Sequence, residues 1–516
     1  MASRTTDKKV SNRDEAAEEL TKWSEKNKKS IGYSTDAAGI DLVNKDVSLT
    51  AGKYGPIVLR DYQMLQQLQN FNRERVPERV VHAKGAGAFG YFECTDAITD
   101  LTVSKVFESV GKKTPIAVRF SQVAGNLGSA DTVRDPRGFA LKFYTEEGNW
   151  DLVGNNTPIF FMRDPILFPM FIHSQKRNPV TNLRDWDAFW DYMGRRPESV
   201  HQFLFLFSDR GIPDGHRHQH GYGSHTFSLI GKNSKLTWVK FIYRTDQGIK
   251  NLDPDTANKL AGTDPDYAVR DLYNAIEEGK KTGKYPSWTF YIQTMTPEQA
   301  SKQKLNPFDI TKVWQHKDFP LRKVGRFVLN RNPGNHFSEV EQLSFSPSNF
   351  TPGFGPSPDR LLQGRLFGYH DSHLHRMGTN FEQLPVNRPI KKIANFQRDG
   401  TSVLYNQGGA PNYHPNSFGG PEVDPAAKNW TLPPEHVNGD VNYYDLGNDD
   451  NYTQPKIFYN NVLDEAARGR LVNNLAGAIQ NAKKEIQDRA VEVFKNVDSD
   501  LGERLTKALA QVKVNL

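Results

Sequence analysis

The sequence predicts an α+β protein with an antiparallel β-barrel or sandwich at its centre and helices at its C-terminal end. Residues 71–320 alternate short apolar runs with clusters of turn residues, a pattern typical of successive β-hairpins. The last part of the chain instead repeats leucines at helical spacing. With 516 residues, the chain can bury roughly three quarters of its surface and needs no disulfide or metal to fold.

Two segments show the hairpin pattern clearly. In residues 140–153, two apolar runs flank the turn sequence Glu-Glu-Gly-Asn. In residues 226–244, two more flank Gly-Lys-Asn-Ser, and Val239, Phe241 and Tyr243 fall on one face of the second strand. Several hairpins of this kind in succession favour a barrel or a sandwich.

The composition and the spacing of apolar residues change along the chain, and we divide the chain into four parts. These are an N-terminal arm over residues 1–70, the β core over 71–320, an irregular segment over 321–440 and a helical domain over 441–516. The arm is polar and mixed in charge at first, with a helix expected around residues 15–28. The irregular segment is rich in Pro, Gly and Asn, which is typical of a segment that wraps over something else. In the helical domain, apolar residues recur at helical spacing at Leu471, Leu475, Ile479, Ala482 and Ile486, and again at Leu501, Leu505, Ala508, Leu509 and Val512.

The composition excludes several classes of protein. The net charge is +6, from 66 Lys and Arg against 60 Asp and Glu, too slight an imbalance to predict a nucleic-acid-binding surface. No run of about 18 apolar residues occurs, so we expect no membrane-spanning helix. The single cysteine, Cys94, excludes disulfides within the chain and Cys-based metal sites. Because the N-terminus lacks an apolar signal segment, we expect an intracellular protein in a reducing compartment.

Two motifs have competing interpretations. Gly85–Gly90 matches the dinucleotide-binding pattern G-x-G-x-x-G, but the following residues predict a strand rather than the helix that would hold a pyrophosphate. We favour a glycine-rich strand that lets a flat partner approach closely. His216, His218 and His220 would share one face of a strand and could chelate a divalent metal. No carboxylate follows at close spacing, and we favour a polar strand or loop.

Arg365 and Tyr369 are one turn apart in a predicted helix within the irregular segment. Ser357 can cap this helix and Pro358 suits its first turn, while leucines line the same stripe as Tyr369. A guanidinium beside a phenol stabilises the phenolate and lowers its pKa from about 10. Tyrosinate suits ferric iron, and tyrosine is one of the axial ligands of haem. Such a pair is by itself usually a packing detail, so its meaning depends on the rest of the chain.

One further run, at residues 71–92, has an unusual composition: Phe-Asn-Arg-Glu-Arg-Val-Pro-Glu-Arg-Val-Val-His-Ala-Lys-Gly-Ala-Gly-Ala-Phe-Gly-Tyr-Phe, with His82 in an apolar strand just after several arginines. It strongly resembles the distal-side signature of the monofunctional haem catalases, and residues 365–376 resemble their proximal haem-ligand signature. Further matching segments lie at residues 118–121, 131–139 and 149–161. The resemblance extends over approximately residues 35–500. It implies an eight-stranded antiparallel β-barrel with an N-terminal arm, a long wrapping segment that carries the proximal helix, and a C-terminal helical domain.

On the distal side, the resemblance implies three catalytic residues. His82 would take a proton from the near oxygen of a peroxide and return it to the leaving oxygen, Asn155 would hold and polarise the peroxide, and Ser121 would fix the tautomer of the imidazole. Further matched residues are the apolar Val81, Phe161 and Phe168, which keep the pocket narrow, and Asp135, an acid of the access channel.

On the proximal side, the resemblance implies that Tyr369 binds the haem iron as phenolate while Arg365 balances its charge. The arginines matching those that pair with the haem propionates are Arg79, Arg119 and Arg376. The implied cofactor is haem b, and the implied reaction uses two molecules of hydrogen peroxide: one oxidises the haem and leaves as water, and the second reduces it and leaves as dioxygen. The chain departs from the family at Gly368, where Ala is commoner, and at His370, where Pro is commoner, and neither change threatens the ligand.

The resemblance also implies a second site, for NADPH, which would protect the enzyme from an inactive state rather than drive turnover. The matching positions are His201, Ser208, Arg210, Tyr222, Arg244, Val313, Trp314 and His316, together with His220, where NADPH-binding members have Asn. Catalases of this kind are homotetramers with exchanged arms, so residues 1–70 would lie between subunits. The C-terminal Lys513–Leu516 resembles the Lys-x-Asn-Leu tail of animal peroxisomal catalases, so we expect a peroxisomal location, with a cytoplasmic one as the alternative.

Three other functions remain as alternatives. A haem enzyme of the same fold that rearranges fatty-acid hydroperoxides would need an altered distal pocket, and activity on a lipid hydroperoxide would reveal it. A non-haem metal-binding barrel would use the histidines of residues 216–220. A haem-binding or nucleic-acid-binding protein without catalysis would leave His82 and Asn155 unexplained. We therefore expect hydrogen peroxide as substrate and neither nucleic acid nor a membrane as partner.

Overall fold

The computed structural model describes residues 14–429, 431–435, 438–446 and 449–512. The chain divides into two compact units with the boundary between Glu78 and Arg79. The tail Lys513–Leu516, on which the peroxisomal prediction depends, lies outside the described residues.

The first unit contains two short helices, α1 (Glu19–Asn27) and α2 (Tyr62–Phe71), and neither helix has a buried residue. Helix α1 falls within the helix expected around residues 15–28. The large apolar side chains exposed on this unit are Leu20, Trp23, Ile31, Tyr33, Ile40, Val43, Val47, Leu49, Tyr54, Ile57, Leu59, Tyr62, Leu65, Leu68 and Phe71. So many exposed apolar groups are typical of a surface that packs against a partner.

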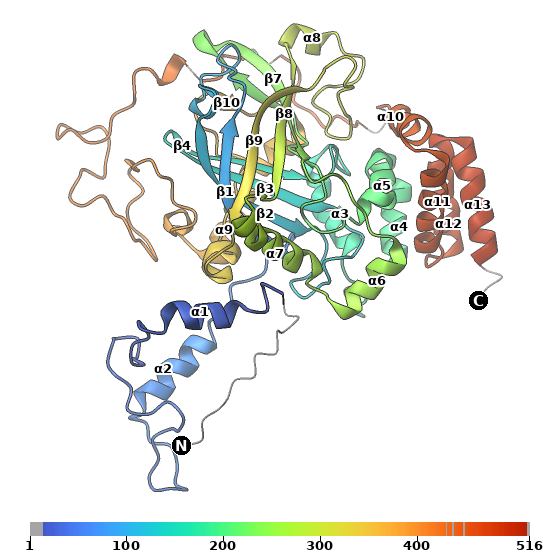
Figure 1. Ribbon diagram of the computed structural model, residues 1–516. Helices are drawn as coiled ribbons and strands as arrows, with labels where there is room; N and C mark the ends of the chain where they lie inside the picture. Colours follow the sequence, from blue (N-terminus) through green and yellow to red (C-terminus); the bar gives the residue numbers. More distant parts are fainter. Residues whose placement is uncertain (1–13, 430, 436–437, 447–448, 513–516) are drawn as a thin grey trace. The chain divides into compact units, whose positions relative to one another are not determined.

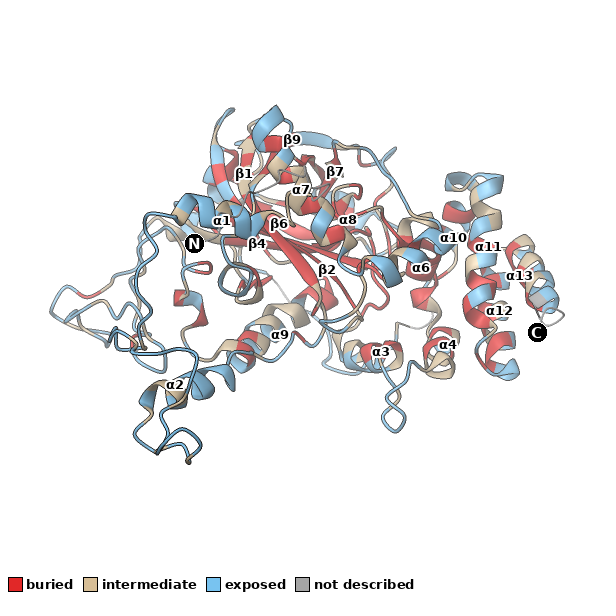
Figure 2. Cartoon of the chain, turned by 60° about the horizontal axis from the view of Figure 1, so that its bottom comes forward, coloured by how far each residue is buried: buried red, intermediate tan, exposed pale blue. Residues whose placement is uncertain are grey.

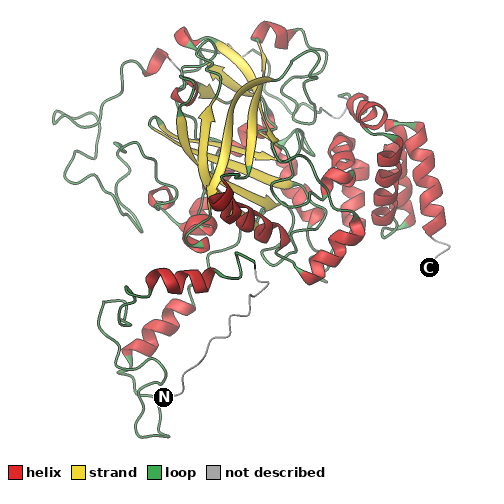
Figure 3. Ribbon diagram, in the orientation of Figure 1, coloured by secondary structure: helices red, strands yellow, loops and turns green. Residues whose placement is uncertain are grey.

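In the second unit, ten strands form one antiparallel sheet (yellow in Figure 3). They are β1 (Gly85–Cys94), β2 (Lys113–Gln122), β3 (Arg137–Thr145), β4 (Gly148–Asn155), β5 (Gly221–Tyr222), β6 (Phe227–Ile230), β7 (Leu236–Thr245), β8 (Ser287–Met295), β9 (Arg322–Arg331) and β10 (Phe354–Gly355). Their order is β10-β6-β7-β5-β4-β3-β2-β1-β9-β8, and β7 also pairs with β8. That last pairing closes a ring from β7 through β5, β4, β3, β2, β1 and β9 to β8. The eight-stranded antiparallel barrel expected from the resemblance is confirmed.

The hairpins predicted from the sequence are present as β3–β4 and β6–β7. On β7, Val239, Phe241 and Tyr243 belong to a single buried cluster, as their shared face predicts. The barrel interior is rich in aromatic rings, and Trp150 stacks on Phe354 with ring centroids 4.1 Å apart. This rigid interior fixes the strand ends that carry site residues.

The glycine-rich run Gly85–Gly90 lies within β1, so the strand interpretation is confirmed and the dinucleotide pattern is not followed by a helix. A Cβ at Gly90 would overlap the carbonyl oxygen of Val328 on β9. The glycine therefore permits close approach, but of a neighbouring strand rather than of a flat ligand.

Helices cover the barrel and continue the chain at its C-terminal end (Figure 1). They are α3 (Phe168–Gln175), α4 (Trp186–Arg195), α5 (Val200–Phe207), α6 (Pro254–Thr263), α7 (Tyr267–Thr282), α8 (Pro297–Ser301), α9 (Arg360–Met377), α10 (Thr453–Ile457), α11 (Glu465–Ile479), α12 (Lys484–Val497) and α13 (Ser499–Val512). Helices α11 to α13 pack with α4 and α5 through buried apolar residues, which Figure 2 shows in red. The helical spacing that extended from residue 471 to residue 486 is interrupted between Ile479 and Lys484, so it covers two helices. Among the described residues, no helix is long and apolar enough to cross a membrane.

Between α9 and α10 the described residues are mostly loop, with only short 3-10 turns at Phe381–Gln383 and Ala427–Asn429. The chain here runs around the outside of the barrel in Figure 1 (orange). This agrees with the later part of the irregular segment predicted over residues 321–440. The earlier part differs, because residues 322–331 form the barrel strand β9, which pairs with β1 and β8.

Candidate active site

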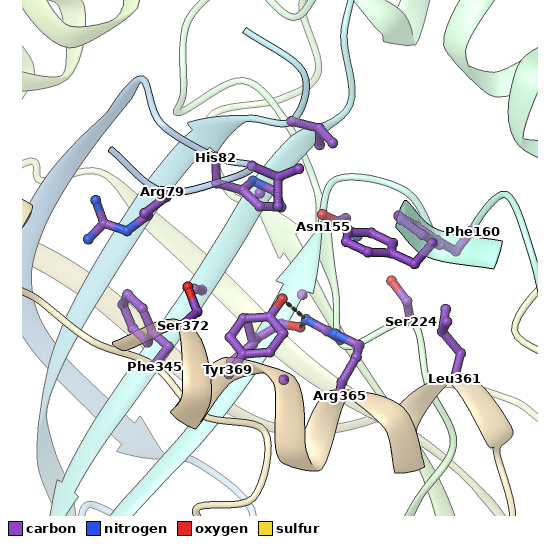
Figure 4. A pocket seen from close by; sticks show the side chains of 18 of the residues that line it. Arg79, His82, Asn155, Phe160, Ser224, Phe345, Leu361, Arg365, Tyr369 and Ser372 are labelled. Carbon is purple, nitrogen blue, oxygen red and sulfur yellow. Dashed lines mark hydrogen bonds between the residues drawn. The ribbon is translucent and has the colours of Figure 1, made fainter. Parts of the chain in front are cut away.

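A cavity of about 390 Å³ lies between the barrel and helix α9 (Figure 4). Its walls come from the loop before β1, from β2, β3 and β4, from the start of α3, and from α9. The sequence-predicted residues that line it are Arg79, Val81, His82, Arg119, Ser121, Asn155, Phe168, Arg365 and Tyr369. The fold therefore brings both signature segments to a single cavity.

His82 lies just before β1, not within a strand as expected from its apolar neighbours. Its φ is +64°, a left-handed conformation that is costly for a residue with a side chain and is typical of functional sites. The backbone holds this conformation because His82 N–H donates to Val123 O at 3.1 Å and Arg119 Nη1 donates to His82 O at 2.8 Å. The unusual backbone aims the ring into the cavity.

The imidazole of His82 is held by Ser121, whose Oγ lies 2.9 Å from Nδ1. Burial, together with the charges of Arg119 and other arginines, lowers the pKa of His82 to about 3. The ring is therefore neutral at physiological pH. With Nδ1 engaged by Ser121, Nε2 is the nitrogen available to a ligand.

Gly138 on β3 makes room for this arrangement. A Cβ at this position would overlap both Ser121 Oγ and His82 Nδ1. Gly138 pairs across the sheet with Asn155, the last residue of β4. The amide of Asn155 thereby enters the same cavity as the imidazole (Figure 4).

The opposite wall is helix α9, whose first turn is capped by Asp359, the carboxylate accepting from Leu362 N–H at 3.1 Å. The prediction that Ser357 caps this helix is therefore wrong. Ser357 Oγ instead donates to Thr226 O at 2.5 Å and accepts from Asp359 N–H at 3.2 Å. Pro358 consequently precedes the cap instead of occupying the first helical turn.

Tyr369 and Arg365 project from α9 into the cavity, as their spacing predicts (Figure 4). Arg365 Nη2 donates to Tyr369 Oη at 2.5 Å and to Val153 O at 3.0 Å. A guanidinium bonded to the phenol oxygen stabilises its anionic form. The wall thus presents an oxygen ligand with its counter-charge in place.

Behind this pair lies a buried His225–Asp359 contact that the sequence reasoning did not identify. His225 Nδ1 is 2.7 Å from Asp359 Oδ2, and each side chain is 1% exposed. His225 also lines the cavity. Its pKa is lowered by burial, and the neighbouring carboxylate opposes that shift. The carboxylate therefore both caps α9 and anchors an imidazole beside Arg365.

The three arginines predicted to bind the propionates, Arg79, Arg119 and Arg376, are all buried. Arg79 and Arg119 line the cavity, whereas Arg376 stands next to Arg79 at the end of α9. Burial lowers the pKa of all three guanidinium groups. Two buried N–H groups, Arg79 Nη1 and Arg119 Nε, have no hydrogen-bond partner among the described residues. Buried donors on positive groups that make no hydrogen bond fit the carboxylates of an anionic ligand.

The chemistry of the lining therefore fits haem. A tyrosine with an arginine partner would hold the iron, and arginine donors that make no hydrogen bond would hold the propionates. Gly368 leaves space, since a Cβ there would meet nothing within 4 Å, so the commoner Ala would also fit. His370 does not line the cavity, and its side chain is 46% exposed. Neither departure from the family pattern disturbs the candidate ligand.

A second cavity, of about 560 Å³, adjoins the first, because Val123 lines both. Phe161 and Asp135 line this second cavity. Phe161 was expected to narrow the haem pocket, but it does not line the first cavity. Asp135 Oδ2 accepts from the N–H groups of Val123 and Ala124 at 2.6 and 2.8 Å. Burial raises its pKa.

A third cavity, of about 410 Å³, gathers most of the residues predicted for NADPH: His201, Arg210, Tyr222, Arg244, Val313, Trp314 and His316. Ser208 and His220 are not among its lining residues. Ser208 Oγ donates to Phe205 O, and His220 Nδ1 accepts from Thr245 N–H. Lys240 and Lys317 add to the positive lining.

The histidines of residues 216–220 do not converge on one point. His216 stacks on Phe120 with centroids 5.0 Å apart, His218 Nδ1 bonds a backbone carbonyl, and His220 Nδ1 accepts a backbone N–H. Within the described part of the chain, no group of three or more His, Cys, Asp or Glu side chains is placed to hold a metal ion. The interpretation as a polar loop is the one that fits.

The chain is similar to known proteins over most of its length. The family model described as Catalase matches residues 35–420, and that described as Catalase-related immune-responsive matches residues 446–509. A catalase of Sus scrofa is 56% identical over 504 residues, covering 96% of this chain and 94% of the relative. A catalase of Drosophila melanogaster is 56% identical over 509 residues, covering 98% and 99%.

Solved structures show the same similarity. A fungal catalase superposes with a TM-score of 0.90 at 45% identity, covering 93% of this chain and 97% of that one. Catalase A from Saccharomyces cerevisiae superposes with a TM-score of 0.89 at 45% identity, covering 92% and 99%. Barrel, site and similarities together define a haem-dependent oxidoreductase.

The chain belongs to the catalase family. It is a monofunctional haem catalase, which disproportionates hydrogen peroxide to water and dioxygen and uses haem iron as its cofactor.

Proposed function

We propose that His82 and Asn155 act on hydrogen peroxide in a cavity that would hold haem b, with Tyr369 as the residue that would bind its iron. The observation that carries this proposal is the cavity of about 390 Å³ with the imidazole on one wall and the Arg365–Tyr369 pair on the opposite wall. When bound, the haem would supply the redox chemistry, giving electrons to one peroxide molecule and regaining them from a second.

His82 acts as the acid and base. Because its ring is neutral, Nε2 takes a proton from one peroxide oxygen and returns it to the other as the O–O bond breaks, with no net proton change. Ser121 is a positioning residue, because its contact with Nδ1 fixes the ring. Asn155 holds the peroxide by hydrogen bonds, since an amide orients and polarises but does not exchange protons.

Arg365 donates a hydrogen bond to Tyr369 Oη and would supply the counter-charge of a phenolate bound to iron, which is an electron-donating ligand. Arg79, Arg119 and Arg376 hold the propionates, which is favoured by the donors of the first two that make no hydrogen bond. Val81 and Phe168 narrow the cavity to a small substrate, and peroxide arrives through the adjoining cavity that Phe161 and Asp135 line.

The test of this function is substrate discrimination by the purified haem-loaded chain. We expect one dioxygen for every two molecules of hydrogen peroxide consumed, measured with an oxygen electrode, and no turnover of a fatty-acid hydroperoxide. Rearrangement of the lipid hydroperoxide without oxygen evolution would overturn the proposal. Peroxide consumption that requires an added reductant would also overturn it.

The third cavity binds NADPH. The support is its positive lining, with Arg210 and Arg244 placed for phosphate groups, and its aromatic side chains for the rings. Equilibrium dialysis should give binding that Arg244→Gln weakens at least tenfold, while Lys232→Gln, on a surface turn, leaves it unchanged. Equal NADPH binding by the wild type, Arg244→Gln and Lys232→Gln would contradict this assignment.

The chain assembles as a homotetramer through the exposed apolar side chains of residues 20–71, and it functions in peroxisomes. The support is the exposed apolar surface of the first unit and the Lys-Val-Asn-Leu tail. Sedimentation should give four copies per particle, and deletion of Lys513–Leu516 should move the protein to the cytoplasm. A monomer, or an unchanged location after the deletion, would contradict the respective statement.

A further inference from the structure

The arginines of the candidate propionate site share one acidic neighbour, Glu341. Its Oε1 lies 2.8 Å from Arg376 Nη2 and 3.6 Å from Arg79 Nη1. Glu341 ends a π-helical turn (Phe337–Glu341), Arg79 precedes β1, and Arg376 lies in the last turn of α9. One carboxylate thus contacts guanidinium groups from two distant segments.

These groups have little access to water. The side chains of Arg376, Arg79 and Glu341 are 1%, 10% and 13% exposed. Burial lowers the pKa of Arg79 most, and the charges of Arg119 and Arg376 lower it further, whereas Glu341 raises it. Glu341 likewise raises the pKa of Arg119 and of Arg376. Repulsion among the three cations is therefore relieved by a single anion.

The charge count depends on whether haem is bound. Three guanidinium groups and one carboxylate leave the haem-free site with a net charge of +2, and the two propionates of haem b neutralise it. Without the carboxylate, the haem-free site would hold three buried cations and no anion among these groups. An uncompensated buried charge is strongly destabilising, whereas a paired one is not.

We propose that Glu341 is the permanent counterion of the arginine cluster, which allows the propionate site to fold before haem binds. This inference rests on the haem assignment of the proposed function. Glu341 is a positioning residue: it stabilises the arginines, and the arginines bind the propionates. It therefore matters most in the haem-free chain, because bound propionates take over its role.

A purely structural role for Glu341 makes a different prediction. The backbone of its turn is already held by Arg79 Nη2, which donates to the carbonyls of Val340, Glu341 and Leu343 at 3.1, 3.0 and 2.8 Å. These bonds do not involve the carboxylate, so Glu341→Gln removes the charge and retains the turn. A structural side-chain contact would be lost equally with and without haem.

The experiment compares thermal unfolding of the full-length wild type and Glu341→Gln in three states: haem-free, loaded with haem, and loaded with haem dimethyl ester, which has no free carboxylates. We expect Glu341→Gln to lower Tm by about 3 °C or more in the haem-free and ester-loaded states. With haem, the difference should fall below about 1 °C.

Glu339→Gln is the matched control. Glu339 belongs to the same turn but pairs at 3.1 Å with the half-exposed Arg331, outside the arginine cluster. Exposed pairs contribute little, so this variant should leave Tm unchanged in all three states. An equal loss of Tm for Glu341→Gln in all three states, or no loss in any, overturns the proposal.

Protein yield provides a second test if haem-free Glu341→Gln does not stay soluble. Its soluble yield should be lost when cells lack haem and recovered when haem is supplied, while Glu341→Asp, which keeps the charge, should depend less on haem. No recovery by haem contradicts the proposal. If the wild type itself takes up no haem, the proposed function fails instead.

Discussion

The two walls of the candidate haem cavity are built in opposite ways. On the distal wall, His82 occupies a loop at φ +64° and its ring is kept neutral by burial and nearby cations. On the proximal wall, Tyr369 occupies the regular helix α9 (Arg360–Met377), with Arg365 bonded to its oxygen. His82 has to be neutral to accept a proton from peroxide, whereas Tyr369 has to present its oxygen to the iron from a rigid position. Arginines act on both walls: the charges of Arg119, Arg365 and Arg79 help to lower the pKa of the imidazole, and Arg365 also donates a hydrogen bond to the phenol oxygen.

The proximal wall gives the largest expected effect. Tyr369→Phe removes the only oxygen that this residue offers to iron, so the purified variant should contain little haem, measured as Soret absorbance per chain. Tyr413→Phe is the control, since Tyr413 is 52% exposed, and it should retain full haem. A Tyr369→Phe protein with normal haem content and activity would show that Tyr369 is not the ligand.

A substitution on the distal wall should have the second-largest effect, and it should lower turnover without removing haem. His82→Ala should keep haem but lose oxygen evolution by about 10²–10⁴-fold, the contribution of a positioned acid–base group. His218→Ala is the control, because His218 only bonds a backbone carbonyl, and its activity should be unchanged. Near-normal activity of His82→Ala would contradict the catalytic role of His82. Loss of activity with His218→Ala would assign a role to the histidines of residues 216–220.

Ser121→Ala should have a smaller effect. It removes one hydrogen bond to the imidazole, a contribution of about 1 kcal/mol, so kcat/KM should fall roughly three- to tenfold while haem content stays normal. Replacement by Thr, which keeps the hydroxyl, should restore part of the rate. If Ser121→Ala lowered kcat/KM as far as His82→Ala does, Ser121 would have a direct role in catalysis and would not be only a positioning residue.

The smallest effect is on pH dependence. The pKa of His82 is lowered from 6.5 to about 3, so the ring stays neutral as the pH falls through 6.5, and kcat/KM should be flat from about pH 8 to pH 5. Stability behaves differently. Between pH 6.5 and about 3, the unfolded chain binds a proton on His82 that the folded chain does not, so stability decreases as the pH falls. A loss of kcat/KM with a midpoint near pH 6.5 would mean that the imidazole is not shielded.

The sequence predicted those parts of the fold that depend on local pattern. Alternating apolar residues gave the β3–β4 and β6–β7 hairpins, and leucine spacing gave the C-terminal helices. Closure of the barrel by β7 and β8 could not be derived from local pattern, because it depends on pairing between distant segments, and only the resemblance implied it.

The same distinction explains the errors at the site. His82 was expected in a strand because its neighbours are apolar, but hydrogen bonds to Val123 and Arg119 impose the left-handed loop. Ser357 was expected to cap α9, but its hydroxyl bonds a carbonyl of another segment and Asp359 takes its place. His225 lies 134 positions from its partner Asp359, so no motif links the two.

The visible spectrum of the purified protein, recorded before and during addition of hydrogen peroxide, tests the two-walled haem site most directly. We predict a Soret band with high-spin ferric features that survives while dioxygen is released. A protein that stays colourless after incubation with haemin, or one that binds haem and releases no dioxygen, would contradict it.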